Sequence, residues 1–194
     1  MKAKFSHSWL GLIVYAAVMP SAEAHTFGAY DAGLLAGLAH PFMGLDHLLA
    51  MIAVGIWAAQ LGGRAVWLVP LTFVSVMSAA AALGSVGLPL PFLEPVVASS
   101  VLVLGLLIAG PVRLPAGAGA ALAALFAVFH GYAHGLELPQ AATPIFYGIG
   151  FVLATILLHG VGIGFALSLR QYKIIQRIAG YALVAASGLL LVAV

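Results

Sequence analysis

Apolar residues run along this chain in stretches long enough to cross a membrane, and short turns rich in Gly and Pro separate them. About 20 apolar residues in a helix cover the roughly 30 Å of hydrocarbon in a bilayer. No connection is long enough to separate two domains. The pattern therefore predicts an all-α, polytopic membrane protein, a bundle of six transmembrane helices, over residues 34–61, 66–87, 93–111, 116–137, 144–169 and 174–194.

The beginning of the chain has the pattern of a secretory signal peptide. Lys2 and Lys4 precede an apolar run over residues 9–19, and small residues surround a cleavage point after Ala24. The run is shorter than the roughly 20 residues of a membrane span, which favours a cleaved signal over an uncleaved first helix. The predicted organisation is a signal peptide over residues 1–24 and a single membrane domain over residues 25–194.

The composition supports a membrane protein and excludes several other classes. Hydrophobic residues make up 64% of the chain and charged residues only 6%, against about 45–50% and about 25% in soluble domains. The formal charge of +2 comes with no basic cluster among aromatic residues, so a nucleic-acid partner is not expected. The absence of cysteine excludes disulfides and thiolate metal sites.

The basic residues that follow the predicted signal all fall on one side of the predicted bundle. They lie after spans one, three and five, and the positive-inside rule makes that side cytoplasmic. The mature N-terminus and the C-terminus should then face outward. The residues are Arg64, Arg113, Arg170, Lys173 and Arg177.

Ionisable residues lie inside the first predicted span. His40, Asp46 and His47 stand where a transmembrane helix is normally apolar, and a central Asp alone costs about 2.5–3.5 kcal/mol on insertion scales. Seven residues make nearly two helical turns, so His40 and His47 should share one face of a helix over residues 34–61. Asp46 would support a neighbouring ligand or bind from beside that face.

A second group of polar residues lies in the fourth predicted span. His130, His134 and Glu137 follow each other at helical spacing on one face, at the depth of His40 and His47. Glu94 begins the third span on the same outer side. Imidazole with some carboxylate and no sulfur suits Ni²⁺, Co²⁺, Zn²⁺ or Cu²⁺. A single buried His is more often a hydrogen-bonded packing residue, but this convergence favours a metal site.

Two further histidines are weaker candidates for metal ligands. His159 lies in the middle of span five among glycines. It is either a deeper relay site for the metal or a residue that packs against a neighbouring helix. Cleavage of the signal would leave His25 with a free amino group, and the two together could chelate a metal outside the membrane; an ordinary chain terminus is the alternative.

Several long motifs resemble those of the HupE/UreJ family of bacterial membrane proteins. Residues 40–51, His-Pro-Phe-Met-Gly-Leu-Asp-His-Leu-Leu-Ala-Met, resemble its first motif, and residues 129–137, Phe-His-Gly-Tyr-Ala-His-Gly-Leu-Glu, its second. Glu94 with residues 98–105 resembles its third. The resemblance covers essentially the whole mature chain. It implies nickel uptake at the bacterial inner membrane in support of hydrogenase or urease, and it leaves open which enzyme is served and whether cobalt is carried instead.

The function expected from these residues is a secondary permease or a facilitated-diffusion pathway for Ni²⁺ or Co²⁺, not an enzyme, with no prosthetic group. The chain has no phosphate-binding loop for ATP. The expected partners are a divalent metal ion and the lipid bilayer, and a homo-oligomer stays open. The expected metal ligands are His40, Asp46, His47, His130, His134 and Glu137, with Glu94, His159 and His25 as further candidates.

Two other functions are compatible with the same residues. An intramembrane zinc hydrolase would hold Zn²⁺ with three ligands and activate a water at the fourth position, with Asp46 as base. Against it, the chain lacks a His-Glu-x₂-His element. An accessory protein would bind metal outside through His25 and pass it on without forming a pathway.

Overall fold

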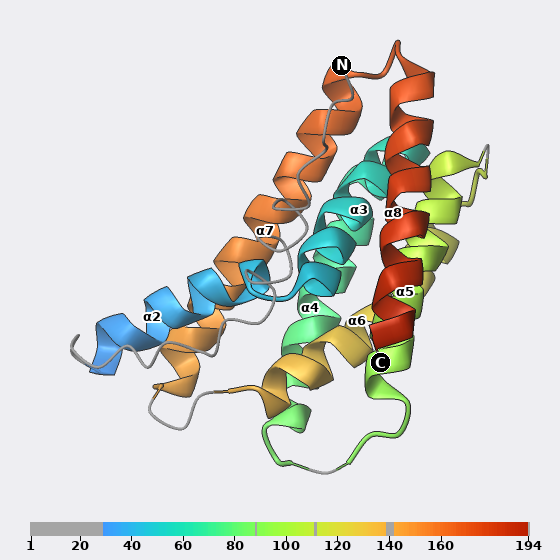
Figure 1. Ribbon diagram of the computed structural model, residues 1–194. Coiled ribbons are helices and arrows are strands. Elements are labelled where there is room, and N and C mark those ends of the chain that lie inside the picture. Colours follow the sequence, from blue (N-terminus) through green and yellow to red (C-terminus); the bar gives the residue numbers. More distant parts are fainter. Residues whose placement is uncertain (1–28, 88, 111, 139–141, 194) are drawn as a thin grey trace, which may run out of the picture.

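The computed structural model describes residues 29–87, 89–110, 112–138 and 142–193, and every regular element in these ranges is a helix. The predicted signal peptide and His25 lie outside the described residues. In chain order the elements are α2 (Ala29–Ala39), the short 3₁₀ helix η1 (His40–Phe42), α3 (Leu45–Leu61), α4 (Ala65–Gly84), α5 (Leu93–Ala109), α6 (Ala116–Leu136), α7 (Pro144–Ser168) and α8 (Lys173–Ala193) (Figure 1).

Several of these helices are suited to cross a membrane. By length and composition α4, α6, α7 and α8 each qualify, and α2 with α3 qualifies as one bent pair. Helix α5 is apolar but has only 17 residues. The chain is thus a multi-pass membrane protein with four to five such spans among the described residues, and the count of six remains a prediction.

The first predicted span is not one continuous helix, so the expectation of a single helix face carrying His40 and His47 is wrong. The axes on the two sides of the break differ by 80°. Pro41 lies in η1 and Gly44 is extended, with φ −100° and ψ 118°. Proline has no N–H to donate and its ring clashes with the preceding turn, which interrupts an α-helix. Consequently His40 and His47 belong to separate elements.

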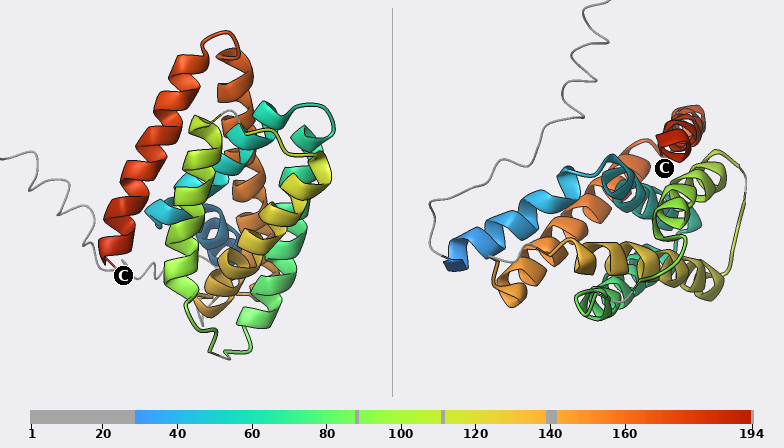
Figure 2. Two further views of the ribbon diagram at one scale, coloured as in Figure 1. Left: turned by 90° about the vertical axis from the view of Figure 1, so that its right-hand side faces the viewer. Right: turned by 60° about the horizontal axis from the view of Figure 1, so that its bottom comes forward.

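Close approach of parallel helices depends on glycine at several crossings. Helix α7 runs beside α2 and then α3, while α4 runs beside α6 (Figure 2). A Cβ added at Gly37 would collide with the Tyr147 backbone, and one added at Gly162 would collide with the Ile52 backbone. The same holds for Gly131 against Met77. Small residues let membrane helices approach in this way, without help from the hydrophobic effect.

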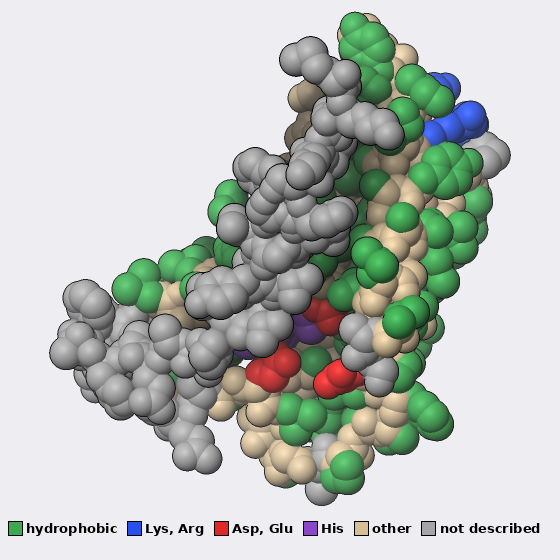
Figure 3. Space-filling view, viewed as in Figure 1, with side chains coloured by type: hydrophobic (Ala, Val, Ile, Leu, Met, Phe, Trp, Pro, Cys, Tyr) green, Lys and Arg blue, Asp and Glu red, His purple; other side chains and the backbone are tan. Residues whose placement is uncertain are grey.

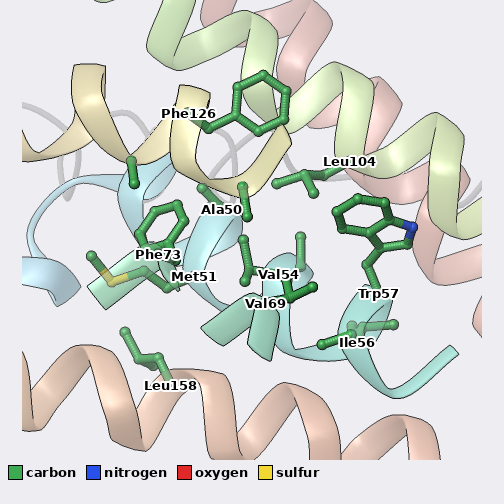
Figure 4. Close-up of a cluster of buried hydrophobic side chains, with 14 of the residues drawn as sticks. Ala50, Met51, Val54, Ile56, Trp57, Val69, Phe73, Leu104, Phe126 and Leu158 are labelled. Atoms are coloured by element: carbon green, nitrogen blue, oxygen red, sulfur yellow. The ribbon is translucent and has the colours of Figure 1, made fainter. Parts of the chain in front are cut away.

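Helix α3 forms the centre of the apolar core. Ala50, Met51, Val54 and Trp57 have no exposed surface, because neighbouring helices cover α3 on several sides. Figure 4 shows side chains of other helices around them, namely Phe73, Leu104, Phe126 and Leu158.

Charges are separated along the long axis of the bundle. Basic residues lie in or beside the turns after α3, α5 and α7, and Figure 3 shows basic side chains near one end, with the acidic ones well away from it. Four of these basic residues surround a cavity of about 290 Å³. They are Arg113, Arg170, Lys173 and Arg177, and Arg64 follows α3.

The glycine contacts lead to a test of the fold. Gly162→Ala should lower the stability by about 1–3 kcal/mol, because the new methyl group overpacks the α3–α7 crossing. Gly164→Ala on the same helix is the matched control, since its Cβ would meet nothing within 4 Å. Thermal unfolding in detergent measures both, and equal unfolding midpoints would contradict the close crossing.

Candidate metal-binding site

Two histidines and a glutamate from separate elements meet beside the helix break. The Nε2 atom of His40 donates to Glu137 Oε2 at 2.9 Å, and His134 Nδ1 lies 3.4 Å from the same oxygen. One ligand atom from each residue can be chosen so that all three lie within 4.8 Å of one another. His40 comes from η1, His134 from the last turn of α6, and Glu137 from the residue that follows α6. This is a geometry that a single cation can occupy.

An aspartate orients a third histidine at the beginning of α3. His47 Nδ1 donates to Asp46 Oδ1 at 2.7 Å, and the His47 backbone N–H donates to the same oxygen at 2.8 Å. The bond places the imidazole proton on Nδ1 and leaves the lone pair on Nε2. A carboxylate behind a histidine commonly holds it in this way in metal sites. Because His47 Nε2 is buried and has no hydrogen-bond partner in the part of the chain that the structure describes, it is available as a ligand.

The imidazole rings form a continuous series. The ring centroids of His40 and His134 are 4.9 Å apart, those of His134 and His47 are 4.1 Å apart, and those of His47 and His130 are 5.0 Å apart. The His40 side chain, at one end of the series, is 23% exposed, the side chains of His134 and His47 are 2% and 9% exposed, and His130, at the other end, has no exposed surface. The series therefore leads from the surface into the bundle.

The deepest ring of this series has a partner on α5. The Ser100 hydroxyl donates to the Val97 carbonyl at 2.7 Å, so its oxygen accepts the 2.8 Å hydrogen bond from His130 Nε2. This arrangement leaves the lone pair of His130 on Nδ1, which is buried and has no partner among the residues that the structure describes. His130 thus repeats the pattern of His47, with one nitrogen held and the other free.

An acidic cavity opens onto this group. Its volume is about 440 Å³, and the three acidic side chains that the structure describes, Asp46, Glu94 and Glu137, all line it together with His40, His47 and His134. Figure 3 shows the acidic side chains around a hollow with histidine visible inside it. Glu94 lines the wall without a recorded hydrogen bond or ion pair to a histidine. The cavity concentrates negative charge where a cation would approach.

The unpaired nitrogens are the strongest indication of a ligand. Buried polar atoms normally have hydrogen-bond partners, because burying them unpaired is costly. Within the described residues, no such partner exists for His47 Nε2, His130 Nδ1 or His134 Nε2, while His134 Nδ1 lies 3.4 Å from Glu137 Oε2. A borderline divalent cation would pair with such lone pairs. The donor set of imidazole and carboxylate fits the cations expected from the sequence.

The sequence of this chain matches the HupE / UreJ protein family over residues 12–191. The chain belongs to the HupE/UreJ family. Protein HupE of Rhizobium leguminosarum bv. viciae is 48% identical to it over 181 residues, which cover 91% of this chain and 94% of that protein. No solved structure matches the chain. The family assignment made from the motifs is confirmed.

In this HupE/UreJ protein, the predicted site residue His159 lies apart from the group. His159 is almost fully buried, and its Nδ1 donates to the Met51 carbonyl at 2.7 Å. Its ring packs against Phe73 and contacts none of the other histidines that the structure describes. His25 lies outside the described residues, so its role stays a prediction.

Sequence reasoning missed several neighbours of the histidines. Ser100 holds His130, and its position in the third family motif was the available signal. Tyr147 and Phe151 of α7 lie beside His40 and His134, at centroid distances of 5.7 Å and 4.2 Å respectively. Nothing in the local sequence of α7 indicates these contacts, because they depend on how α7 crosses α2 and α6.

The hydrogen bond between Ser100 and His130 gives a stability test. Ser100→Ala should lower the stability by about 1–3 kcal/mol, because His130 Nε2 loses its acceptor in a dry interior. Thermal unfolding of the purified protein measures the change. Ser78→Ala is the control, since this exposed serine bonds only to Val74 of its own helix. An unfolding midpoint equal to that of the control would argue against the bond.

Proposed function

We propose that this protein carries a transition metal ion, in the first place Ni²⁺, across the bacterial inner membrane by facilitated diffusion or secondary transport. The observation that carries the proposal is the meeting of His40, His134 and Glu137 at an acidic cavity, next to buried imidazole nitrogens without partners. Membership of the HupE/UreJ family supports it, since that family is associated with nickel or cobalt transport for hydrogenase or urease.

The path of the ion follows the series of rings. Glu137 and Glu94 attract the hydrated cation at the cavity, and His40 with His134 and Glu137 replaces part of its water. The ion then reaches His47, whose free Nε2 is presented by Asp46, and next His130. Each step exchanges one imidazole lone pair for another, so the ion need not lose all its ligands at once.

The charge distribution supports a direction for this path. The basic turns after α3, α5 and α7 would face the cytoplasm under the positive-inside rule. The acidic cavity and the mature termini would then face the periplasm, as cleavage of a signal over residues 1–24 also requires. Uptake from the periplasm follows from this orientation.

The zinc hydrolase has no support among the described residues, and we do not propose it. A hydrolytic base must reach a metal-bound water. The carboxylate oxygen Oδ1 of Asp46 instead accepts two hydrogen bonds from His47. Asp46 therefore acts as an orienting group for a ligand.

Uptake of radioactive Ni²⁺ into proteoliposomes tests the transport proposal. We expect the initial rate of uptake to fall at least about tenfold, at equal protein level, in each of the variants His134→Gln, His40→Gln and Glu137→Gln. Mutation of a residue that merely supports a metal ligand already lowers metal affinity or activity by about 10–100-fold. Competition by Co²⁺, Zn²⁺ and Mg²⁺ identifies the favoured ion.

The control for these variants is Gln171→Ala, an exposed residue in the turn after α7, at the basic end. Its uptake should equal that of the wild type. If the wild-type protein binds Ni²⁺ but transports none, the proposal that it is a permease is wrong. Uptake that persists when the whole His40, His134 and Glu137 group is changed would favour an accessory role through His25.

Asp46→Asn separates orientation from charge. Asn in this position loses the carboxylate that fixes the His47 proton on Nδ1, so the Ni²⁺ affinity should fall about 10–100-fold. Equilibrium dialysis of purified protein against Ni²⁺ measures the affinity. A value equal to that of the wild type would show that His47 does not need this carboxylate in order to bind metal.

A further inference from the structure

His159 is buried deep in the bundle with an unused ring nitrogen. Its exposure is 2%, and its Nδ1 lies 2.7 Å from the Met51 carbonyl oxygen. A carbonyl only accepts, so the proton is on Nδ1 and the lone pair is on Nε2. Within the described residues His159 Nε2 has no hydrogen-bond partner.

The bond to Met51 does not by itself require a histidine. An amide side chain such as that of Asn supplies an N–H donor at a similar distance from the backbone and leaves no imidazole nitrogen behind. A histidine instead adds a buried lone pair that costs free energy unless something binds it. The hydrogen bond fixes the tautomer of the ring and leaves the other nitrogen with its lone pair, as it also does in His47 and His130.

One aromatic ring contacts both His159 and a histidine of the series. The Phe73 side chain on α4 has no exposed surface, and its ring centroid is 5.8 Å from that of His130 and 5.2 Å from that of His159. His130 and His159 thus contact the same ring, and each has one free nitrogen.

We propose that His159 is an inner binding station for the transported divalent cation, reached from His130 past the ring of Phe73. The proposal rests on the transport function proposed above and extends the path beyond the acidic cavity. It assigns His159 Nε2 as the ligand atom and the Met51 carbonyl as the group that fixes its tautomer. The ion would leave His159 toward the basic end of the bundle.

His159→Asn tests this station, because it keeps a donor for the Met51 carbonyl and removes Nε2. The variant should still bind Ni²⁺ at the outer group in equilibrium dialysis, which also shows that it is folded. Its Ni²⁺ uptake into proteoliposomes should fall at least about tenfold. If the variant takes up Ni²⁺ as fast as the wild type, the inner station is wrong and the transport proposal stands. If the wild-type protein itself neither binds nor takes up Ni²⁺, the inner station and the transport proposal are both wrong.

A gain of signal tests the same point without loss of function. The chain has no cysteine, so His159→Cys introduces a single thiol at the station. Addition of Ni²⁺ should produce a thiolate-to-nickel charge-transfer absorption. Ser187→Cys is the matched control, because this fully buried serine on α8 bonds to the Ala98 carbonyl and should give no such band. Absence of the band in the His159→Cys variant, with Ni²⁺ bound at the outer group, would overturn the proposal.

Discussion

The break between α2 and α3 determines the geometry of the histidine group. If residues 34–61 formed one helix, His40 and His47 would lie about two turns apart on one face, some 10 Å from each other along the axis. The 80° bend at Pro41 and Gly44 instead brings both rings within 5 Å of His134, measured between ring centroids. The break also places His40 in a half-exposed element at the edge of the acidic cavity. One local interruption thus converts a helical stripe into a convergent set of candidate ligands.

Burial in an apolar bundle constrains every histidine deeper than His40. A neutral imidazole has one donor and one acceptor, and the structure satisfies only one of the two in His47, His130 and His159. The partners are a carboxylate, a hydroxyl and a backbone carbonyl, and each holds the proton on a defined nitrogen. Rigid helix crossings built on glycine keep these partners in place, since neither Gly55 nor Gly162 leaves room for a side chain. The result is a set of preoriented lone pairs whose desolvation cost a cation would offset.

Much of the architecture and most of the site could be predicted from local pattern. A helix needs about 20 apolar residues to cross a bilayer. The positions of α4, α6, α7 and α8 therefore follow from the lengths of the hydrophobic runs. Helical spacing placed His130, His134 and Glu137 together, and opposite chain directions predicted their meeting with His40 and His47. The prediction failed at Pro41, because proline within the first turn of a helix is compatible with either a continuous or a broken helix. The choice depends on α7, which packs along both α2 and α3.

The sequence by itself determined the membrane class, the family and the candidate site residues, because apolar run length and ionisable residues within such runs are local properties. Only the tertiary structure decided which nitrogen of each imidazole is free. That choice depends on Ser100, Asp46 and the Met51 carbonyl, and two of these three partners lie 30 or more positions away from their histidine. The contacts of the Phe73 ring with His130 and His159 are likewise made between residues far apart in the sequence. Contacts of this kind arise from helix crossings, whose angles and registers are set by many small contacts that no single stretch of sequence contains.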